Sequence, residues 1–418
     1  MGAVTTRRQP GFKRDGGSTR RHSPDYLLLL LTVALAAVGI IVVFSISPAL
    51  AVEKGVDGNQ YVFKQIIAVV LGLAIFGIAA SVPLDKWGRL YKPLLVVAAL
   101  ATILALAMPV NAQYPAHRWI RLAGFSFQSV ELVKFAGIMW LASFLSWRID
   151  KGLMANVDKT IKPLGAVFLG MAVIVAGLQS DFGSFMVMVA MMGVMAFVAG
   201  LPVKKLLIGL AILGILGTIL ISAMPYRRER LTAFMHPDCL SSGYQACQAL
   251  IAVGSGGMIG LGLGRSVQAY GYLPEAENDS IFAIYAEKFG FIGVTVLLGL
   301  FAAFFTRIKK VAEKAPDNFS RLVVMGILVW LSGQTIINVG AMIGLLPLKG
   351  ITLPLVSYGG SSVLMVMGAL GVVFQVSRHT LYSIPEEQAV TTGGSGYDNS
   401  RNGRRVRGAY HPAPGRRA

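Results

Sequence analysis

The chain has 418 residues, of which 55% are hydrophobic and 14% charged, and it carries a formal net charge of +18. Its mean hydropathy of +0.64 is far above that of a soluble globular protein. The apolar residues come in repeated blocks of about 20, the length that crosses a bilayer, which excludes a soluble domain. Because Lys and Arg gather in the tails and short connections, the charge indicates membrane topology, and we expect no nucleic-acid partner.

The apolar blocks predict ten transmembrane helices. The predicted ranges are 26–50, 62–82, 93–110, 130–147, 163–178, 183–199, 206–224, 281–306, 322–345 and 361–381. The first block follows a basic stretch but is longer than the apolar region of a signal peptide, so we interpret it as an uncleaved helix. The predicted fold is therefore all-α: an integral membrane bundle of about ten helices, with a long outer loop between helices 7 and 8.

The distribution of basic residues predicts the orientation of this bundle. With an even number of spans and the amino terminus inside, the cytoplasmic connections hold most of the Lys and Arg residues. The domain boundaries follow: a disordered basic cytoplasmic tail at residues 1–25, the membrane domain at 26–381, and a second such tail at 382–418. The large outer loop covers residues 225–280.

Two outer connections are basic, although topology disfavours cations on that face. They contain His117, Arg118 and Arg121 in one case, and Arg227, Arg228, Arg230 and Arg265 in the other. An anionic ligand at the outer surface would explain them. The alternative is local pairing with carboxylates such as Glu229 and Asp238.

The outer loop contains an apolar, glycine-rich stretch at residues 249–264. It is too short to span a bilayer, so we interpret it as a re-entrant or interfacial segment that must pack against protein. Its glycines favour close packing over a nucleotide site, because no Walker lysine accompanies them. Cys239 and Cys247 lie in the same loop and form either a disulfide or two free buried thiols.

Ionisable residues at membrane depth are costly and are candidates for function. Glu131 and Lys134 share one helix face and can neutralise each other. Asp181 can cap the helix that follows it. The richest cluster is residues 272–280, YLPEAENDS, with the carboxylates Glu275, Glu277 and Asp279. Asp279 is either a helix N-cap, with Asn278 and Ser280 as competitors, or a desolvated general base with a raised pKa.

The run at residues 338–362, NVGAMIGLLPLKGITLPLVSYGGSS, is similar to the signature of the SEDS (shape, elongation, division and sporulation) family of peptidoglycan polymerases. The resemblance continues through residues 117–120, 179–183, 244–248 and 272–282, and covers about 26–381. Within the family, residues 274–276 and 349–354 resemble the cell-division member more than the elongation member.

This resemblance implies a glycosyltransferase that polymerises lipid II, an undecaprenyl-diphosphate-linked disaccharide peptide, at the outer face of the bacterial cytoplasmic membrane. It implies action at the division septum with a class B penicillin-binding protein transpeptidase and other divisome membrane proteins. The catalytic aspartate of the family maps onto Asp279. Because the leaving group is an anionic lipid diphosphate, the reaction needs a base but no general acid.

Around Asp279, other residues are candidates for substrate binding or support. Substrate-binding candidates are Arg118, Arg121, Glu275, Lys349 and Ser357. Supporting candidates are Glu131, Lys134, Asp181 and Gln248. No cofactor is assigned with certainty, and a divalent cation, Mg²⁺ or Mn²⁺, is an alternative to the basic residues as the group that holds the diphosphate. Two other functions stay open, a lipid II flippase and a non-enzymatic division scaffold.

Overall fold

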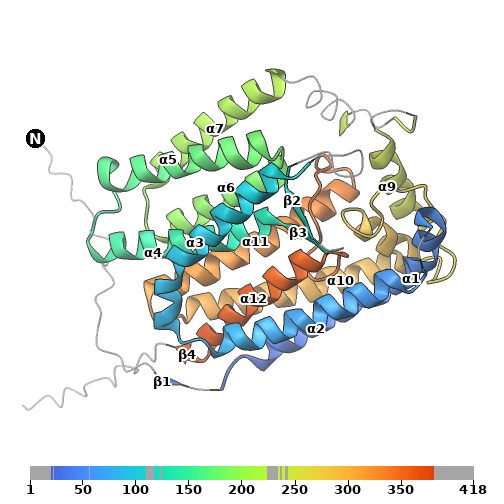
Figure 1. Ribbon diagram of the computed structural model, residues 1–418, viewed down its shortest axis with the longest axis horizontal. Coiled ribbons are helices and arrows are strands. Elements are labelled where there is room, and N and C mark those ends of the chain that lie inside the picture. Colours follow the sequence, from blue (N-terminus) through green and yellow to red (C-terminus); the bar gives the residue numbers. More distant parts are fainter. Residues whose placement is uncertain are drawn as a thin grey trace, which may run out of the picture. The chain divides into compact units, whose positions relative to one another are not determined.

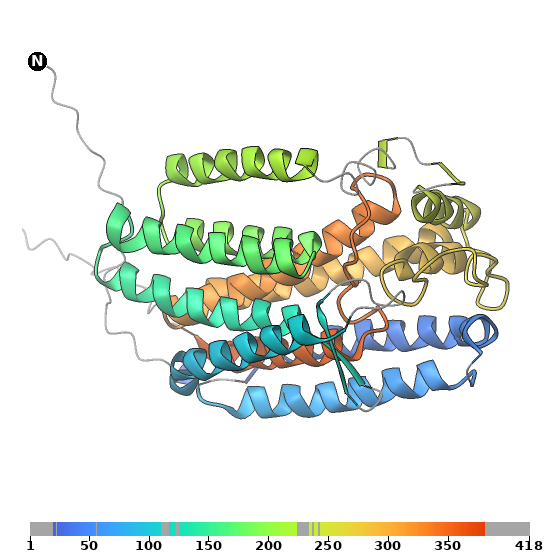
Figure 2. The same cartoon turned by 45° about the horizontal axis from the view of Figure 1, so that its top comes forward.

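The computed structural model describes residues 20–21, 23–55, 57–109, 117–122, 125–223, 234–235, 238–240 and 243–380. Its helices are α1 (Tyr26–Lys54), α2 (Gln60–Ser81), α3 (Leu84–Ala107), α4 (Ser129–Asp150), η1 (Val157–Ile161), α5 (Lys162–Met171), η2 (Ala172–Leu178), α6 (Phe182–Val198), α7 (Val203–Ala223), α9 (Tyr244–Ser255), α10 (Ile281–Glu313), α11 (Asn318–Met342) and α12 (Gly360–Ser377). The long helices lie side by side (Figures 1 and 2). The protein is an all-helical polytopic membrane protein.

Each predicted span coincides with a helix. Eight helical segments in the described part of the chain are long and apolar enough to cross a bilayer, including the continuous segment Val157–Leu178 that joins η1, α5 and η2. Two more apolar helices, α6 with 17 residues and α7 with 21, occupy the other predicted positions. That all ten cross the membrane stays a prediction.

Several helices extend beyond the spans that hydropathy predicts. The third helix begins at Leu84, although the apolar block starts only near Pro93. Residues 84–92 are helical but polar on one side, so hydropathy alone did not include them in the predicted span. The eighth helix extends from Ile281 to Glu313 and contains a break at Gly290, where the backbone leaves helical geometry.

Glycines allow close helix packing at the centre of the bundle. Helix α11 packs against α4, α6, α10 and α12. A β carbon at Gly326 of α11 would lie 2.8 Å from atoms of both Ile138 in α4 and Met195 in α6. Helices α2 and α12 form a second close pair, in which Gly371 rests against the backbone of Phe76. Small residues at such crossings let van der Waals contacts hold the helices together inside a bilayer.

Short strand pairs complete the described structure. One antiparallel pair joins β1 (Arg20–Arg21) to β4 (His379–Thr380), and a hairpin joins β2 (Trp119–Leu122) to β3 (Phe125–Gln128). The hairpin lies beside one end of α12 (Figure 1). It leads the chain from the predicted outer connection between the third and fourth helices directly to α4, whose first residue is Ser129.

The outer loop contains the disulfide that the sequence left open. Cys239 and Cys247 are bonded, with their Cα atoms 5.3 Å apart. Cys247 lies on α9, which covers the first part of the apolar stretch at residues 249–264. The rest of that stretch packs on α10 through backbone hydrogen bonds. It therefore packs against protein, as the sequence predicts for so short an apolar segment.

Candidate functional site

The loops that precede α6, α10 and α12 meet beside the β2–β3 hairpin, and each contains a strained residue. The described non-glycine residues with positive φ are Ser180, Glu275 and Leu355, at 51°, 52° and 66°. Each lies in one of these three loops. Left-handed backbone at ordinary residues costs free energy and persists where the surrounding structure fixes it, often at functional sites. The strain therefore marks this meeting point as the candidate site.

Asp279 and Arg118 converge on Gly350 at this site. A β carbon placed on Gly350 would lie 3.1 Å from Asp279 Oδ2 and 3.4 Å from Arg118 Nη2. Asp279 comes from the loop before α10, Arg118 from the start of the hairpin and Gly350 from the loop before α12. Arg118 is 25% exposed, and its buried Nε has no hydrogen-bond partner within the described residues. A carboxylate and a guanidinium thus share one small space.

The environment of Asp279 changes its ionisation. Burial, and next the negative charge of Glu275, raise the pKa of Asp279, while the Arg118 guanidinium lowers it, and the resulting pKa is about 7. The negative charges of Asp181 and Glu277 also raise this pKa, by smaller amounts. Such a carboxyl group can release and accept a proton near neutral pH, which is the property required of a general base.

Asp279 does not cap the helix that follows. The N-cap position of α10 is Ser280, and the Ser280 hydroxyl donates to the Pro274 carbonyl at 2.8 Å. Among the described residues, no group donates a hydrogen bond to the Asp279 carboxylate. The cap interpretation of Asp279 is therefore wrong, because the turn at residues 274–280 places Ser280 at the start of the helix.

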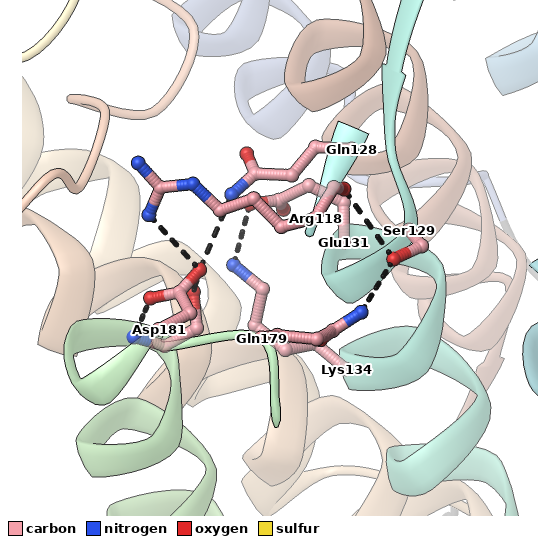
Figure 3. Close-up of polar contacts among 8 residues, drawn as sticks. Arg118, Gln128, Ser129, Glu131, Lys134, Gln179 and Asp181 are labelled. Carbon is pink, nitrogen blue, oxygen red and sulfur yellow. Dashed lines mark hydrogen bonds and ion pairs between the residues drawn. The ribbon is translucent and has the colours of Figure 1, made fainter. Parts of the chain in front are cut away.

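Asp181 connects the hairpin to α6, as Figure 3 shows. Its carboxylate caps α6 by accepting from the Ser184 amide at 2.9 Å, as the sequence predicts. Its Oδ2 also accepts from Gln128 Nε2 at 3.3 Å and lies 3.6 Å from Arg118 Nη1. Asp181 therefore holds Arg118 in the site in addition to capping the helix.

Glu131 and Lys134 form the predicted ion pair directly beneath this cluster. Lys134 Nζ lies 2.6 Å from Glu131 Oε1, and the two side chains are 0% and 3% exposed. The ammonium also lies over the Trp330 ring, 5.2 Å from its centroid. Figure 3 places the pair beside Gln179, which donates to the Ser129 hydroxyl at 2.9 Å. This buried pair supports the first turn of α4.

Two buried residues join the loops that carry Asp279 and Gly350. Asn338 of α11 donates to the carbonyls of Asp279 and Ile351, at 2.7 Å each. The Ser357 hydroxyl donates to the Asn278 carbonyl at 2.7 Å and accepts from the Leu353 amide at 2.8 Å. Ser357 therefore supports the loop in this structure, and its predicted contact with substrate stays a prediction.

The sequence matches one known family across the membrane domain. A sequence model of the FtsW/RodA/SpoVE family, described as cell cycle protein, matches residues 26–382. The chain belongs to this family. The predicted SEDS resemblance is thereby confirmed, because FtsW, RodA and SpoVE are the division, elongation and sporulation members that the resemblance named.

Relatives in this family are similar over most of their length. The probable peptidoglycan glycosyltransferase FtsW of Saccharophagus degradans is 41% identical over 84% of this chain and 92% of its own. The stage V sporulation protein E of Bacillus subtilis is 37% identical over 87% and 100%.

Solved structures share this fold. One is a chain of a peptidoglycan synthase complex that coordinates polymerization and crosslinking, with a TM-score of 0.70 at 28% identity, over 85% of this chain and 98% of that one. Thermus thermophilus RodA gives 0.60 at 28% identity, over 85% and 97%.

Two further site residues of this FtsW/RodA/SpoVE member lie next to the Asp279 and Arg118 space. Lys349 precedes Gly350, is half-buried, and places its ammonium 5.0 Å from the centroid of the Phe182 ring. Glu275 is exposed and accepts from Asn278 Nδ2 at 2.6 Å. Both charges thus flank the site, at the positions that the sequence suggested.

Other predicted residues lie further away or outside the described residues. The Arg121 guanidinium donates to the Pro109 carbonyl. Helix α9 contributes Gln245, which donates to the Ser280 hydroxyl at 3.1 Å, whereas the predicted Gln248 is half-buried one turn further on. The predicted basic residues Arg227, Arg228 and Arg230 lie outside the described residues.

Sequence reasoning missed Gln128 and Asn338. Both are neutral amides, so neither showed the charge at membrane depth that singled out the other candidates. Asn338 does stand at the first position of the signature run at residues 338–362, which was the available signal.

The carboxylates of the site do not form a metal centre by themselves. Within the described ranges, no three His, Cys, Asp or Glu side chains lie close enough to hold a metal ion. Mg²⁺ is often held by one or two carboxylates together with substrate phosphates, so a divalent cation stays a prediction beside the basic residues Arg118 and Lys349.

Proposed function

We propose that this chain is a peptidoglycan glycosyltransferase that polymerises lipid II into glycan strands at the outer face of the cytoplasmic membrane. The observation that carries the proposal is the Asp279 carboxylate, with a pKa of about 7, beside the Arg118 guanidinium. The names of the FtsW relatives support the activity and a role in septal wall synthesis during division.

The proposed reaction joins two sugars through a 4-hydroxyl group. The hydroxyl oxygen of the acceptor bonds to C1 of the donor sugar while the bond from C1 to the lipid diphosphate breaks. The electron pair of that bond leaves with the diphosphate, and Asp279 accepts the hydroxyl proton. A base with a pKa near the working pH is well matched to this transfer. The diphosphate is already anionic, so no acid has to protonate it.

Cations near Asp279 would stabilise the departing diphosphate. Arg118 is the nearest, because its guanidinium and the Asp279 carboxylate flank the same glycine. Lys349 follows, one residue from Gly350. A guanidinium can bind phosphate oxygens through two parallel charge-assisted hydrogen bonds, which fixes orientation as well as charge. Arg121, on strand β2 of the same hairpin, is a further candidate.

The partners in this proposal follow from the relatives. The structure of a peptidoglycan synthase complex that contains a similar chain supports pairing with a class B penicillin-binding transpeptidase. Other divisome membrane proteins would gather with it at the septum. With both termini in the cytoplasm, the Asp279 loop would face the outside, where lipid II is consumed.

The decisive experiment incubates the purified protein, together with its transpeptidase partner, with lipid II and measures glycan strands. Asp279→Asn should lower the rate about 10²–10⁴-fold, because the amide keeps the size of the side chain but cannot accept the proton. Asp317→Asn is the matched control. Asp317 caps α11 by accepting from the Ser320 amide, and an asparagine can do the same.

Each alternative function predicts a different result in this assay. A flippase would move lipid II across liposome membranes and leave Asp279 dispensable for polymerisation by other enzymes. A scaffold would bind its partner and form no glycan. Strands made by Asp279→Asn at the wild-type rate would contradict the proposed mechanism.

A further inference from the structure

Helix α10 is broken at Gly290, and part of the outer loop fills the break. Gly290 has φ 63° and ψ −166°. In an unbroken helix, the amides of Phe291 and Ile292 would donate to carbonyls four residues earlier. Here they donate to the loop carbonyls of Gly257 and Met258, at 2.9 and 3.1 Å.

The carbonyls released by the break also find partners in the loop. The Glu287 carbonyl accepts from the Leu261 amide at 2.9 Å, and the Lys288 carbonyl accepts from the Gly262 amide at 3.0 Å. The loop thus supplies partners for the amides and for the carbonyls that lose their hydrogen bonds within the helix at the break. Because unpaired backbone groups are costly at membrane depth, these four bonds hold the loop to α10.

Glycines make this contact possible. A β carbon on Gly256 would overlap the Ala286 carbonyl, and one on Gly260 would overlap the Lys288 carbonyl. A β carbon on Gly290 would lie 2.8 Å from Ile259 backbone atoms. Close approach of two backbones, predicted from the glycine-rich stretch, therefore occurs at one particular place on α10.

The Glu287 side chain binds the next part of the loop. It is 1% exposed, and its carboxylate accepts from the Val267 amide at 2.8 Å, the Gln268 amide at 3.2 Å and the Ser266 hydroxyl. The carboxylate thus satisfies the turn at residues 266–268 much as an N-cap satisfies the start of a helix.

The Lys288 side chain binds the loop from the other direction. It is 2% exposed, and its ammonium donates to the carbonyl of Leu263 at 2.7 Å and to that of Ser45 in α1 at 3.3 Å. Adjacent residues of opposite charge therefore hold two points of the same loop. Buried charges this well bonded mark a functional position inside a membrane protein.

The anchored turn leads directly to Asp279. The Leu273 amide donates to the Gln268 carbonyl at 3.0 Å, and the loop then runs through residues 274–280 into α10. Residues 269–280 are thus held at one end by Glu287 and at the other by the start of the same helix. Movement of the anchored turn would move Asp279 relative to Arg118.

We propose that Glu287 and Lys288 are positioning residues that fix the outer loop so that the Asp279 carboxylate faces Arg118. The pair acts through the loop and not on the substrate. This inference rests on the proposed glycosyltransferase function for its kinetic consequences, whereas the anchor itself can be measured without any activity.

The kinetic test compares Glu287→Gln with Glu287→Ala. Glutamine can still accept from the Val267 and Gln268 amides and can donate to the Ser266 hydroxyl, so most of the wild-type rate should remain. Alanine removes all three bonds and should lower kcat about 10²-fold with little change in KM, because misplacement of a reacting group by about 1 Å has that cost. Release of the loop should also expose Asp279 to water and so lower its pKa, which moves the rising limb of the pH–rate profile to lower pH.

The structural test is amide hydrogen exchange, followed by mass spectrometry on peptides from residues 256–268. Glu287→Ala should speed exchange there and leave peptides from α11 unchanged. Ser266→Ala removes one hydroxyl and no charge, so it should give a smaller change in exchange in the same direction. It is the variant to use if Glu287→Ala folds poorly. Glu313→Ala is the control, because Glu313 forms an exposed ion pair with Lys309 at the far end of α10.

Two results would overturn the inference. One is unchanged exchange at residues 256–268 in both Glu287→Ala and Ser266→Ala. The other is a Glu287→Gln variant with normal protection but as little activity as Asp279→Asn, since Glu287 would then act through its charge. Failure of the proposed function would appear separately, as wild-type polymerisation by Asp279→Asn.

Discussion

Arg118 and Asp279 approach the same side of Gly350, with Asp279 Oδ2 at 3.1 Å and Arg118 Nη2 at 3.4 Å from the place where a β carbon would stand. They come from two loops more than a hundred residues apart in the chain, and only glycine leaves the space between them open. The cation lowers the pKa of the base that it accompanies, and it is also placed to bind an anionic leaving group.

Substitutions of Arg118 and Glu275 should shift the pH–rate profile in opposite directions. With a pKa of about 7, Asp279 loses its proton as the pH rises through neutrality, so the rate should rise over that range. Arg118 lowers this pKa, so Arg118→Gln should move the rising limb to higher pH. Glu275 raises it, so Glu275→Gln should move the limb to lower pH.

The measurement is the initial rate of lipid II polymerisation from about pH 5 to 9, at saturating substrate so that binding defects do not hide the shift. Arg118→Gln should in addition raise KM, because it removes a proposed diphosphate ligand. Shifts of both variants in the same direction would show that the ionisation of Asp279 does not control the rate.

Asp279→Asn should be more stable to heat than the wild type in alkaline solution. The folded protein holds the Asp279 proton to about pH 7, whereas the unfolded chain releases it near the ordinary value of 3.8. Stability is therefore lost as the pH rises from about 4 to 7, and the loss is complete above that range. Asparagine does not titrate, so the variant avoids the loss.

The check is the thermal unfolding midpoint of both proteins in detergent at about pH 8 and about pH 5. We expect the variant to unfold a few degrees higher at the alkaline pH, with a smaller difference at the acidic pH. An equal difference in midpoint at both pH values would mean that removal of the charge is not the cause of the higher stability.

The sequence could predict charges and helices, but not the contacts that join loops. Apolar blocks located every long helix, since bilayer thickness imposes their length. Asp181 as a cap and the pair of Glu131 and Lys134 followed from local spacing. The break at Gly290 did not, because its cause is a loop 30 residues earlier that supplies the missing hydrogen bonds. Asn338 likewise joins segments that only the fold brings together.

The disulfide gives a direct test of topology. Cys239 and Cys247 are bonded in the outer loop, and they are the only cysteines of the chain. In Cys247→Ser, the remaining thiol of Cys239 should react with a membrane-impermeant maleimide in intact spheroplasts, because positive-inside bias places this loop outside. Labelling of the wild type should require a reductant.

A second variant supplies the control for the inner side. Lys310→Cys, in the Cys239→Ser and Cys247→Ser background, should react only after the membrane is made permeable. Labelling of both positions from the same side would contradict the ten-span orientation.

Substitution of Glu131 alone should destabilise the protein more than substitution of both Glu131 and Lys134, its buried partner. Glu131→Gln leaves the Lys134 ammonium buried without its carboxylate, and loss of one partner of such a pair typically costs about 3–5 kcal/mol. Glu131→Gln with Lys134→Met removes both charges and keeps similar volume, so much of that loss should be regained. The Trp330 ring contacts the lysine and would accept a methionine side chain in its place.

Thermal unfolding midpoints and the amount of protein in the membrane measure both effects. The exposed pair of Lys162 and Asp158, at 2.7 Å, is the matched control, and its single substitutions should change the midpoint little. A double variant that is stable but inactive would show that the pair also acts in the reaction, whereas one that is both stable and active would restrict it to support of α4 beneath Arg118 and Asp181.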